Sequence, residues 1–80
     1  MEILGYCRFG NRDAVVFEEY GQKKVSDGFH DWKVTDENRK RMTERKASEI
    51  NIDKLVSRFR GARPWHPILK ELRKVKKGGN

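Results

Sequence analysis

The clearest helical pattern in the chain is Asn51-Ile-Asp-Lys-Leu-Val-Ser-Arg-Phe-Arg-Gly61. Its apolar residues follow the i, i+3, i+4, i+7 spacing that places them on one face of a helix: Ile52, Leu55, Val56 and Phe59. Asn51 suits the N-cap, and Gly61 stands where a helix commonly ends. These residues predict an amphipathic helix whose apolar face must pack on another layer.

A second amphipathic stretch follows the connector Gly61-Ala-Arg-Pro-Trp-His66. Pro67 suits the first turn of a helix, where its missing N–H costs nothing. Apolar residues form one face of this helix: Ile68, Leu69, Leu72 and Val75. Basic residues cluster on the opposite side: Lys70, Arg73, Lys74 and Lys77. We therefore expect a helix with a basic outer face, followed by a frayed tail at residues 78–80.

Upstream of Asn51, residues 35–50 are charged and contain few apolar side chains. Thr35 or Asp36 can cap a helix, and acids follow in the first turn. The pairs Glu37/Arg41 and Lys40/Glu44 are spaced four apart, as surface ion pairs on a helix are. We predict a surface helix here, either separate from the next one or continuous with it as one bent helix.

Residues 2–34 are rich in β-branched and aromatic residues, interrupted by Gly, Asn and Asp at plausible turns. The spacing predicts antiparallel strands at about 2–9, 14–20 and 29–34, and leaves a strand at 23–25 open. The fold class is therefore α+β. We expect an N-terminal antiparallel sheet of three to four strands, followed by two to three helices packed on it, in one domain spanning residues 1–77.

The predicted core joins the sheet to the helices. Alternation along the last strand puts His30, Trp32 and Val34 on one face, which we expect to look inward. Trp32, Val34, Val15 and Phe17 should then meet the apolar faces of the helices. Trp65 is expected to close the core between two helices, although it could instead stack on an unpaired base.

Charge is distributed unevenly along the chain. Nine Lys or Arg residues and the single acid Glu71 lie between Lys54 and Asn80, whereas the first 34 residues carry five bases and six acids. A formal net charge of +7 gathered at one end typically faces a polyanion. We expect a small non-enzymatic domain that binds DNA or RNA. The predicted contacts are Arg58, Arg60, Arg63, Trp65, Lys70, Arg73, Lys74 and Lys77.

A second function class stays open, in which the protein is a modulator that docks on an acidic surface of a larger enzyme or ribonucleoprotein. The charged stretch 36–49 suits electrostatically steered docking. Aromatic residues of the sheet could serve as anchors: Tyr6, Tyr20 and Phe29. A helix-turn-helix is less consistent with the chain, because the connector between residues 52–60 and 67–77 is too long and contains prolines.

Enzymatic readings have weaker support. Asp13 with Asp31 and Lys33 offers the residue types of a metal-dependent nuclease. Cys7 with His30 or His66 could form a nucleophile and base only if the fold brought them together. The histidines and Cys7 lack zinc-ligand spacing. We expect no catalytic residues, no cofactor, no metal and no small-molecule substrate.

The composition also bears on location. Cys7 is the only cysteine, so an internal disulfide is excluded, which suits a reducing compartment. Glu2 stands where a secretory signal would carry positive charge, and the longest apolar run, residues 14–17, is far too short to span a membrane. We expect a cytoplasmic protein without a membrane partner.

Overall fold

Two tight turns build the first three strands of the computed structural model, which describes the backbone of residues 1–78 and the side chains of residues 1–75. Strands β1 (Glu2–Phe9) and β2 (Arg12–Glu19) form one hairpin, and β2 pairs with β3 (Gln22–Ser26) in a second. The second turn is Tyr20-Gly21, with φ of 53° and 76°. Positive φ at both positions matches the right-handed twist of the strands and fixes their register.

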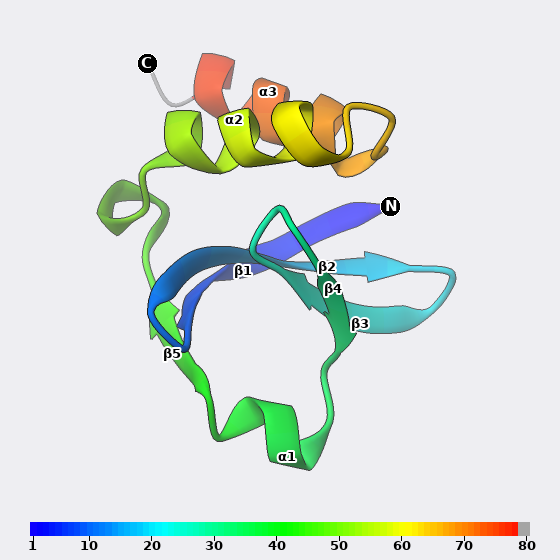
Figure 1. Ribbon diagram of the computed structural model, residues 1–80, viewed down its shortest axis with the longest axis vertical. Coiled ribbons are helices and arrows are strands. Elements are labelled where there is room, and N and C mark those ends of the chain that lie inside the picture. The colour runs from blue at the N-terminus through cyan, green and yellow to red at the C-terminus, as the bar shows by residue number, and fades with distance from the viewer. Residues whose placement is uncertain (79–80) are drawn as a thin grey trace.

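Five antiparallel strands form one sheet in the order β4-β3-β2-β1-β5. Strands β4 (Asp31–Lys33) and β5 (Met42–Arg45) lie at opposite edges, so the chain between them crosses the whole sheet. This crossing segment, residues 34–41, contains the short helix α1 (Asp36–Arg39) and runs beneath one face (Figure 1). The 3-10 turn η1 (Ala47–Glu49) then leads to the other face.

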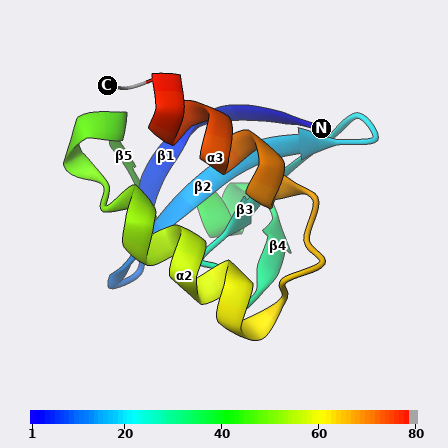
Figure 2. The ribbon, with the colours of Figure 1, turned by 90° about the horizontal axis from the view of Figure 1, so that it is seen from above.

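Helices α2 (Ile52–Ala62) and α3 (Ile68–Gly78) lie side by side on that other face (Figure 2). Asn51 caps α2 by accepting the amide proton of Lys54, as its position predicts. The α+β prediction, with an N-terminal antiparallel sheet followed by helices, is confirmed. The strand left open at 23–25 exists as β3.

The region predicted as a surface helix is mostly not helical. Thr35 does cap a helix, because its Oγ1 accepts the amide proton of Asn38, but α1 ends at Arg39 and β5 follows. Charged residues without an apolar stripe gain too little from packing to sustain a helix. Pairing with β1 instead satisfies the backbone, and Arg41 lies over the Phe9 ring rather than beside Glu37.

The core is split between the two faces of the sheet. The upper core, on the helix side, joins Tyr6, Val15 and Phe17 to residues of α2 and α3. Its helical members are Leu55, Phe59, Ile68, Leu69 and Leu72, and Ile50, which lies between η1 and α2, joins them. The predicted apolar faces of both helices are therefore confirmed, as are the positions of Val15 and Phe17.

The lower core lies on the face that the crossing segment covers. Cys7, Phe9, Ala14 and Val25 are buried there, and the partly buried side chains packed on them are Val16, Trp32, Val34 and Met42. The prediction that Trp32 and Val34 meet the helices was wrong. The alternation along β4 was right, but it turns Asp31, not Trp32, toward the helices. Tyr6, proposed as an exposed anchor, is also buried.

Gly78 still belongs to α3, while residues 79–80 of the expected frayed tail lie outside the described residues. Within the part that the structure describes, no helix has both the length and the apolar character needed to cross a bilayer.

Gly28 allows the β3–β4 turn, residues 26–31, to approach α2 closely. Its φ is +99°, and a Cβ built there would lie 2.6 Å from the Cβ of Arg58. Any side chain at this position would be strained in its backbone and would push the turn away from the helix. Gly61 on α2 is the opposite case, because a Cβ there meets nothing within 4 Å.

We predict that Gly28→Ala lowers the free energy of unfolding by about 2–4 kcal/mol, through the left-handed φ and the clash with Arg58. The matched substitution Gly61→Ala should raise it by about 0.4–1 kcal/mol, because it restricts the unfolded chain at a position with open space. Urea denaturation of both variants checks the pair. Equal stability of Gly28→Ala and the unsubstituted protein would show that the close approach is unimportant.

Candidate nucleic-acid interface

The β3–β4 turn is organised by its own side chains. Asp27 Oδ1 accepts the amide protons of Phe29 and His30 at 2.9 and 3.0 Å, and its Oδ2 accepts from Arg12 at 3.0 Å. The Ser26 hydroxyl accepts the Gly28 amide proton at 3.1 Å. An Asp that bonds backbone amides two and three residues ahead is a standard turn device. The turn is thus held by hydrogen bonds of its own side chains and of Arg12.

Arg58 of α2 joins the turn to the neighbouring strand. Its guanidinium donates to the carbonyl oxygens of Asp13 at 3.2 Å and Asp27 at 3.5 Å. The side chain is half-buried and covers Gly28. Arg58 was predicted as a phosphate contact, and its guanidinium makes these hydrogen bonds within the protein.

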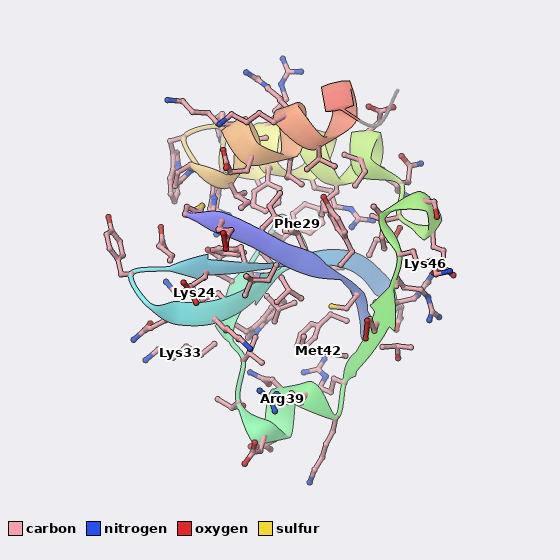
Figure 3. The ribbon with its side chains drawn as sticks, turned by 180° about the vertical axis from the view of Figure 1, so that it is seen from behind. Lys24, Phe29, Lys33, Arg39, Met42 and Lys46 are labelled. Carbon is pink, nitrogen blue, oxygen red and sulfur yellow. The ribbon has the colours of Figure 1, made fainter. Side chains whose placement is uncertain are left out.

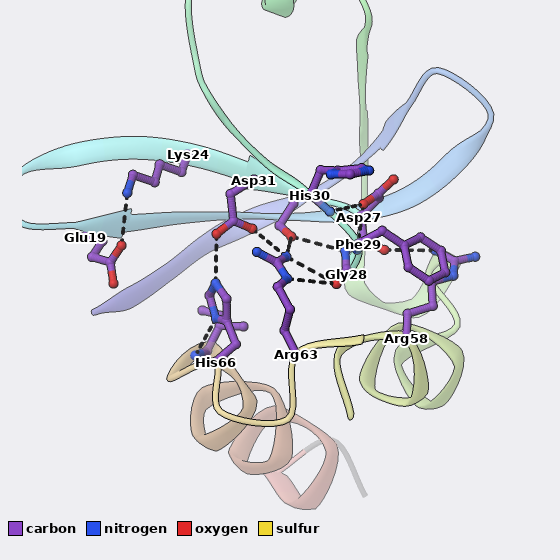
Figure 4. A network of polar contacts seen from close by, with 12 residues as sticks. Glu19, Lys24, Asp27, Gly28, Phe29, His30, Asp31, Arg58, Arg63 and His66 are labelled. Carbon is purple, nitrogen blue, oxygen red and sulfur yellow. Dashed lines mark hydrogen bonds and ion pairs between the residues drawn. The ribbon is translucent and has the colours of Figure 1, made fainter. Parts of the chain in front are cut away.

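Asp31 is the centre of a polar network between the sheet and the helices (Figure 4). Its Oδ1 accepts from Arg63 at 2.8 Å, and its Oδ2 accepts from His66 Nε2 at 2.9 Å. Arg63 also donates to the Ser26 hydroxyl and to the carbonyl oxygen of Gly28, at 3.0 and 3.2 Å. One carboxylate therefore ties β4 to the connector between α2 and α3, residues 63–67.

The surroundings of Asp31 favour its charged form. Burial alone would raise the pKa of this carboxyl. Hydrogen bonds from His66, Arg63 and Ser26 outweigh burial and hold the pKa of Asp31 well below its usual range. Asp31 is thus an ionised, paired group at neutral pH.

His66 has two structural roles in this network. Its Nδ1 accepts the amide proton of Ile68 at 3.1 Å, so it caps the start of α3. With Nδ1 as acceptor, the ring proton is on Nε2 and is donated to Asp31. The ring is buried against Phe17 and Phe59, with centroid separations of 5.8 and 5.0 Å.

Trp65 points away from the core. It is 72% exposed, so the expectation that it closes the space between the helices was wrong. Its neighbours Arg63 and His66 occupy the inward positions, where Asp31 holds both of them. Pro64 restricts the backbone just before Trp65. The Trp65 ring stacks on the His66 ring, with the centroids 5.8 Å apart and an angle of 24° between the ring planes. Trp65 is therefore an exposed aromatic surface on a fixed connector.

The predicted cations separate into two groups. Arg58 and Arg63 are half-buried and donate within the protein. The predicted cations of α2 and α3 whose side chains are described and exposed are together called the basic face: Arg60, Lys70, Arg73 and Lys74. Lys74 pairs with Glu71 at 3.2 Å, a surface contact of small energetic value. The side chain of Lys77, also predicted, lies outside the described residues.

Sequence reasoning missed the residues that position the connector. Turns were expected in residues 2–34, but nothing in the spacing identified Asp31 as the partner of residues 63 and 66, more than thirty positions away. The only available signal was an acid in a strand otherwise rich in aromatic side chains. A charge at such a position requires a partner if it is buried.

The residues considered for catalysis are placed apart or engaged elsewhere. Asp31 is bound by Arg63 and His66, and Asp13 lies 3.9 Å from Arg8. Cys7 belongs to the lower core, whereas His66 packs in the upper core. Burial raises the pKa of the Cys7 thiol to about 11, which disfavours the nucleophilic thiolate. Among the described residues, no cluster of His, Cys, Asp and Glu could hold a metal ion.

Comparisons with known proteins identify no relatives. No protein-family model matches the chain, and neither a curated protein nor a solved structure matches it. A function must therefore be argued from the chemistry of the surface itself.

We predict that Asp31→Asn lowers the free energy of unfolding by about 2–3 kcal/mol at pH 7, because Arg63 loses its charged acceptor. The folded-state pKa of Asp31 is depressed, so its stabilisation is complete above the unfolded Asp pKa of about 3.9 and is lost as pH falls below it. The difference between the two proteins should thus shrink from pH 5 to pH 2. Urea denaturation of both proteins at several pH values measures the difference in their free energies of unfolding. A difference that does not change with pH would contradict the role assigned to Asp31.

Proposed function

We propose that the protein binds single-stranded nucleic acid, with Trp65 stacking on an unpaired base and the basic face contacting phosphates. The observation that carries the proposal is the exposed, fixed position of Trp65 at the start of a helix with a basic outer side. Aromatic side chains beside cationic surfaces are the usual elements of single-strand binding.

The arrangement of the connector supports a single-stranded partner over a duplex. A tryptophan ring can stack only on a base whose face is free, and paired bases inside a duplex are covered by their neighbours. Trp65 lies three residues before α3, and Lys70 is in the first turn of that helix. A strand whose base stacks on Trp65 can therefore continue along α3 with its phosphates facing Lys70, Arg73 and Lys74.

The buried network contributes by holding the connector before any ligand binds. Arg63 and His66 are both fixed by Asp31, so Trp65 between them loses little freedom when a base stacks on it. Arg58 and Arg63, with their guanidinium groups engaged inside the protein, act as positioning residues in this proposal. The phosphate contacts are assigned to the basic face.

We predict that Trp65→Ala weakens binding to a labelled single-stranded 12-mer by about 1–3 kcal/mol, the usual contribution of one stacked base. Fluorescence anisotropy measures the affinity, and quenching of Trp65 should accompany binding to the unsubstituted protein. Tyr20→Ala is the matched control, because Tyr20 is 96% exposed at the β2–β3 turn, outside the proposed surface. Equal losses in both variants would exclude stacking at Trp65.

We also predict that the double substitution Lys70→Gln with Arg73→Gln reduces the slope of log affinity against log salt by about 1.4, because each phosphate contact on a single strand contributes about 0.7. The control Lys40→Gln with Lys46→Gln removes the same amount of charge at two positions outside the basic face. It should leave the slope nearly unchanged. Absence of binding to single strands, duplexes and structured RNA at low salt would refute the proposal. The basic face would then be assigned to docking on an acidic protein.

A further inference from the structure

A cleft lies between the lower face of the sheet and the crossing segment, on the side away from α2 and α3. Its volume is about 390 Å³, within the range of small-molecule sites. The cleft exists because β5 pairs with β1 only from Tyr6 to Phe9. The first residues of β1 therefore pair with β2 but have no strand on the β5 side. The ring contact of Phe9 with Trp32, 4.7 Å between centroids, fills the lower core but leaves this end open.

Apolar groups form the floor of the cleft. Gly5 and Val16 are register partners on β1 and β2, and both line it together with Leu4 and Met42. A Cβ built on Gly5 would meet nothing within 4 Å, so the space above the strand is empty of protein atoms. The Met42 side chain is flexible and adapts to varied apolar shapes. This floor suits an aliphatic body.

Two cations from different elements line the same cleft, Lys23 of β3 and Arg39 of α1. Arg45 of β5 is the register partner of Tyr6 and therefore lies on the helix face of the sheet. Figure 3 shows Arg39 and Met42 on the side of the sheet away from the helices. Within the described part of the chain, neither of these two cations has an ion-pair partner. Glu44 is the one acid among the lining residues.

We propose that this cleft binds a small organic anion with an aliphatic body and one carboxylate, such as a medium-chain fatty acid. The apolar floor would take the chain, and the cations would pair with the carboxylate, for which arginine offers a two-pronged donor. Neither an inorganic anion nor a neutral alcohol satisfies both parts of the site. The inference is independent of nucleic-acid binding, because the basic face and Trp65 lie on the other side of the sheet.

Titration of the ¹⁵N-labelled full chain with octanoate, followed by amide NMR shifts, tests the proposal. We expect saturable shifts concentrated at Gly5, Val16 and Met42, and at least tenfold weaker binding of octanol. Inorganic phosphate should leave these amides unshifted. Equal affinity for octanol would mean that only apolar contact binds the ligand, and equal affinity for phosphate would mean that only charge does. Either result overturns the proposal. The absence of saturable octanoate binding overturns it as well.

Neighbouring residues of the crossing segment supply a matched pair of variants. Arg39→Gln should weaken octanoate binding about tenfold, as loss of a charged hydrogen bond does, whereas Lys40→Gln should leave it unchanged because Lys40 does not line the cleft. Gly5→Val should fill the space and abolish binding while nucleic-acid affinity is retained. Equal weakening by Arg39→Gln and Lys40→Gln would attribute binding to overall charge and overturn the proposal, even if Gly5→Val failed to fold.

Discussion

The half-buried carboxylate of Asp31 is the constraint on which the upper half of the molecule depends. A charge placed between a sheet and two helices is unfavourable unless strong donors surround it, and Arg63 and His66 provide them. Both donors belong to the connector between α2 and α3. Satisfying one acid therefore sets how the helical pair meets the sheet, while Gly28 allows the turn to come close enough.

This arrangement has a consequence for the surface. With residues 63 and 66 turned inward, Trp65 has no place in the upper core and remains exposed. The contacts that hold Arg63 and His66 thus also place Trp65 at the surface, which in the proposed function lowers the cost of ordering it on binding. The proposed single-strand interface is in this sense a by-product of the way in which the chain satisfies Asp31.

The lower face of the sheet is covered by the crossing segment and not by helices α2 and α3. The edge positions of β4 and β5 force residues 34–41 to cross the sheet, and this crossing gives an 80-residue chain a second small core. A single short segment cannot cover five strands, so the cleft beside Gly5 remains uncovered. We expected no small-molecule substrate, and the carboxylate site proposed there is a binding site only. Its residues are spread over five elements, which no local motif could reveal.

Local patterns were sufficient for the elements that carry their own signal. The stripe on α2, the Asn51 cap, the apolar face of α3 and the first hairpin were all predictable, because periodicity and turn chemistry act over a few residues. Residues 35–50 were not, since β5 forms only because β1 offers it an edge. The face on which Trp32 packs, the burial of Arg63 and the exposure of Trp65 likewise depend on contacts between distant segments. The sequence determined α2, α3, most strands and the basic outer side of α3. Only the tertiary structure decided which charges remain free, because a charge is neutralised by partners that folding brings near.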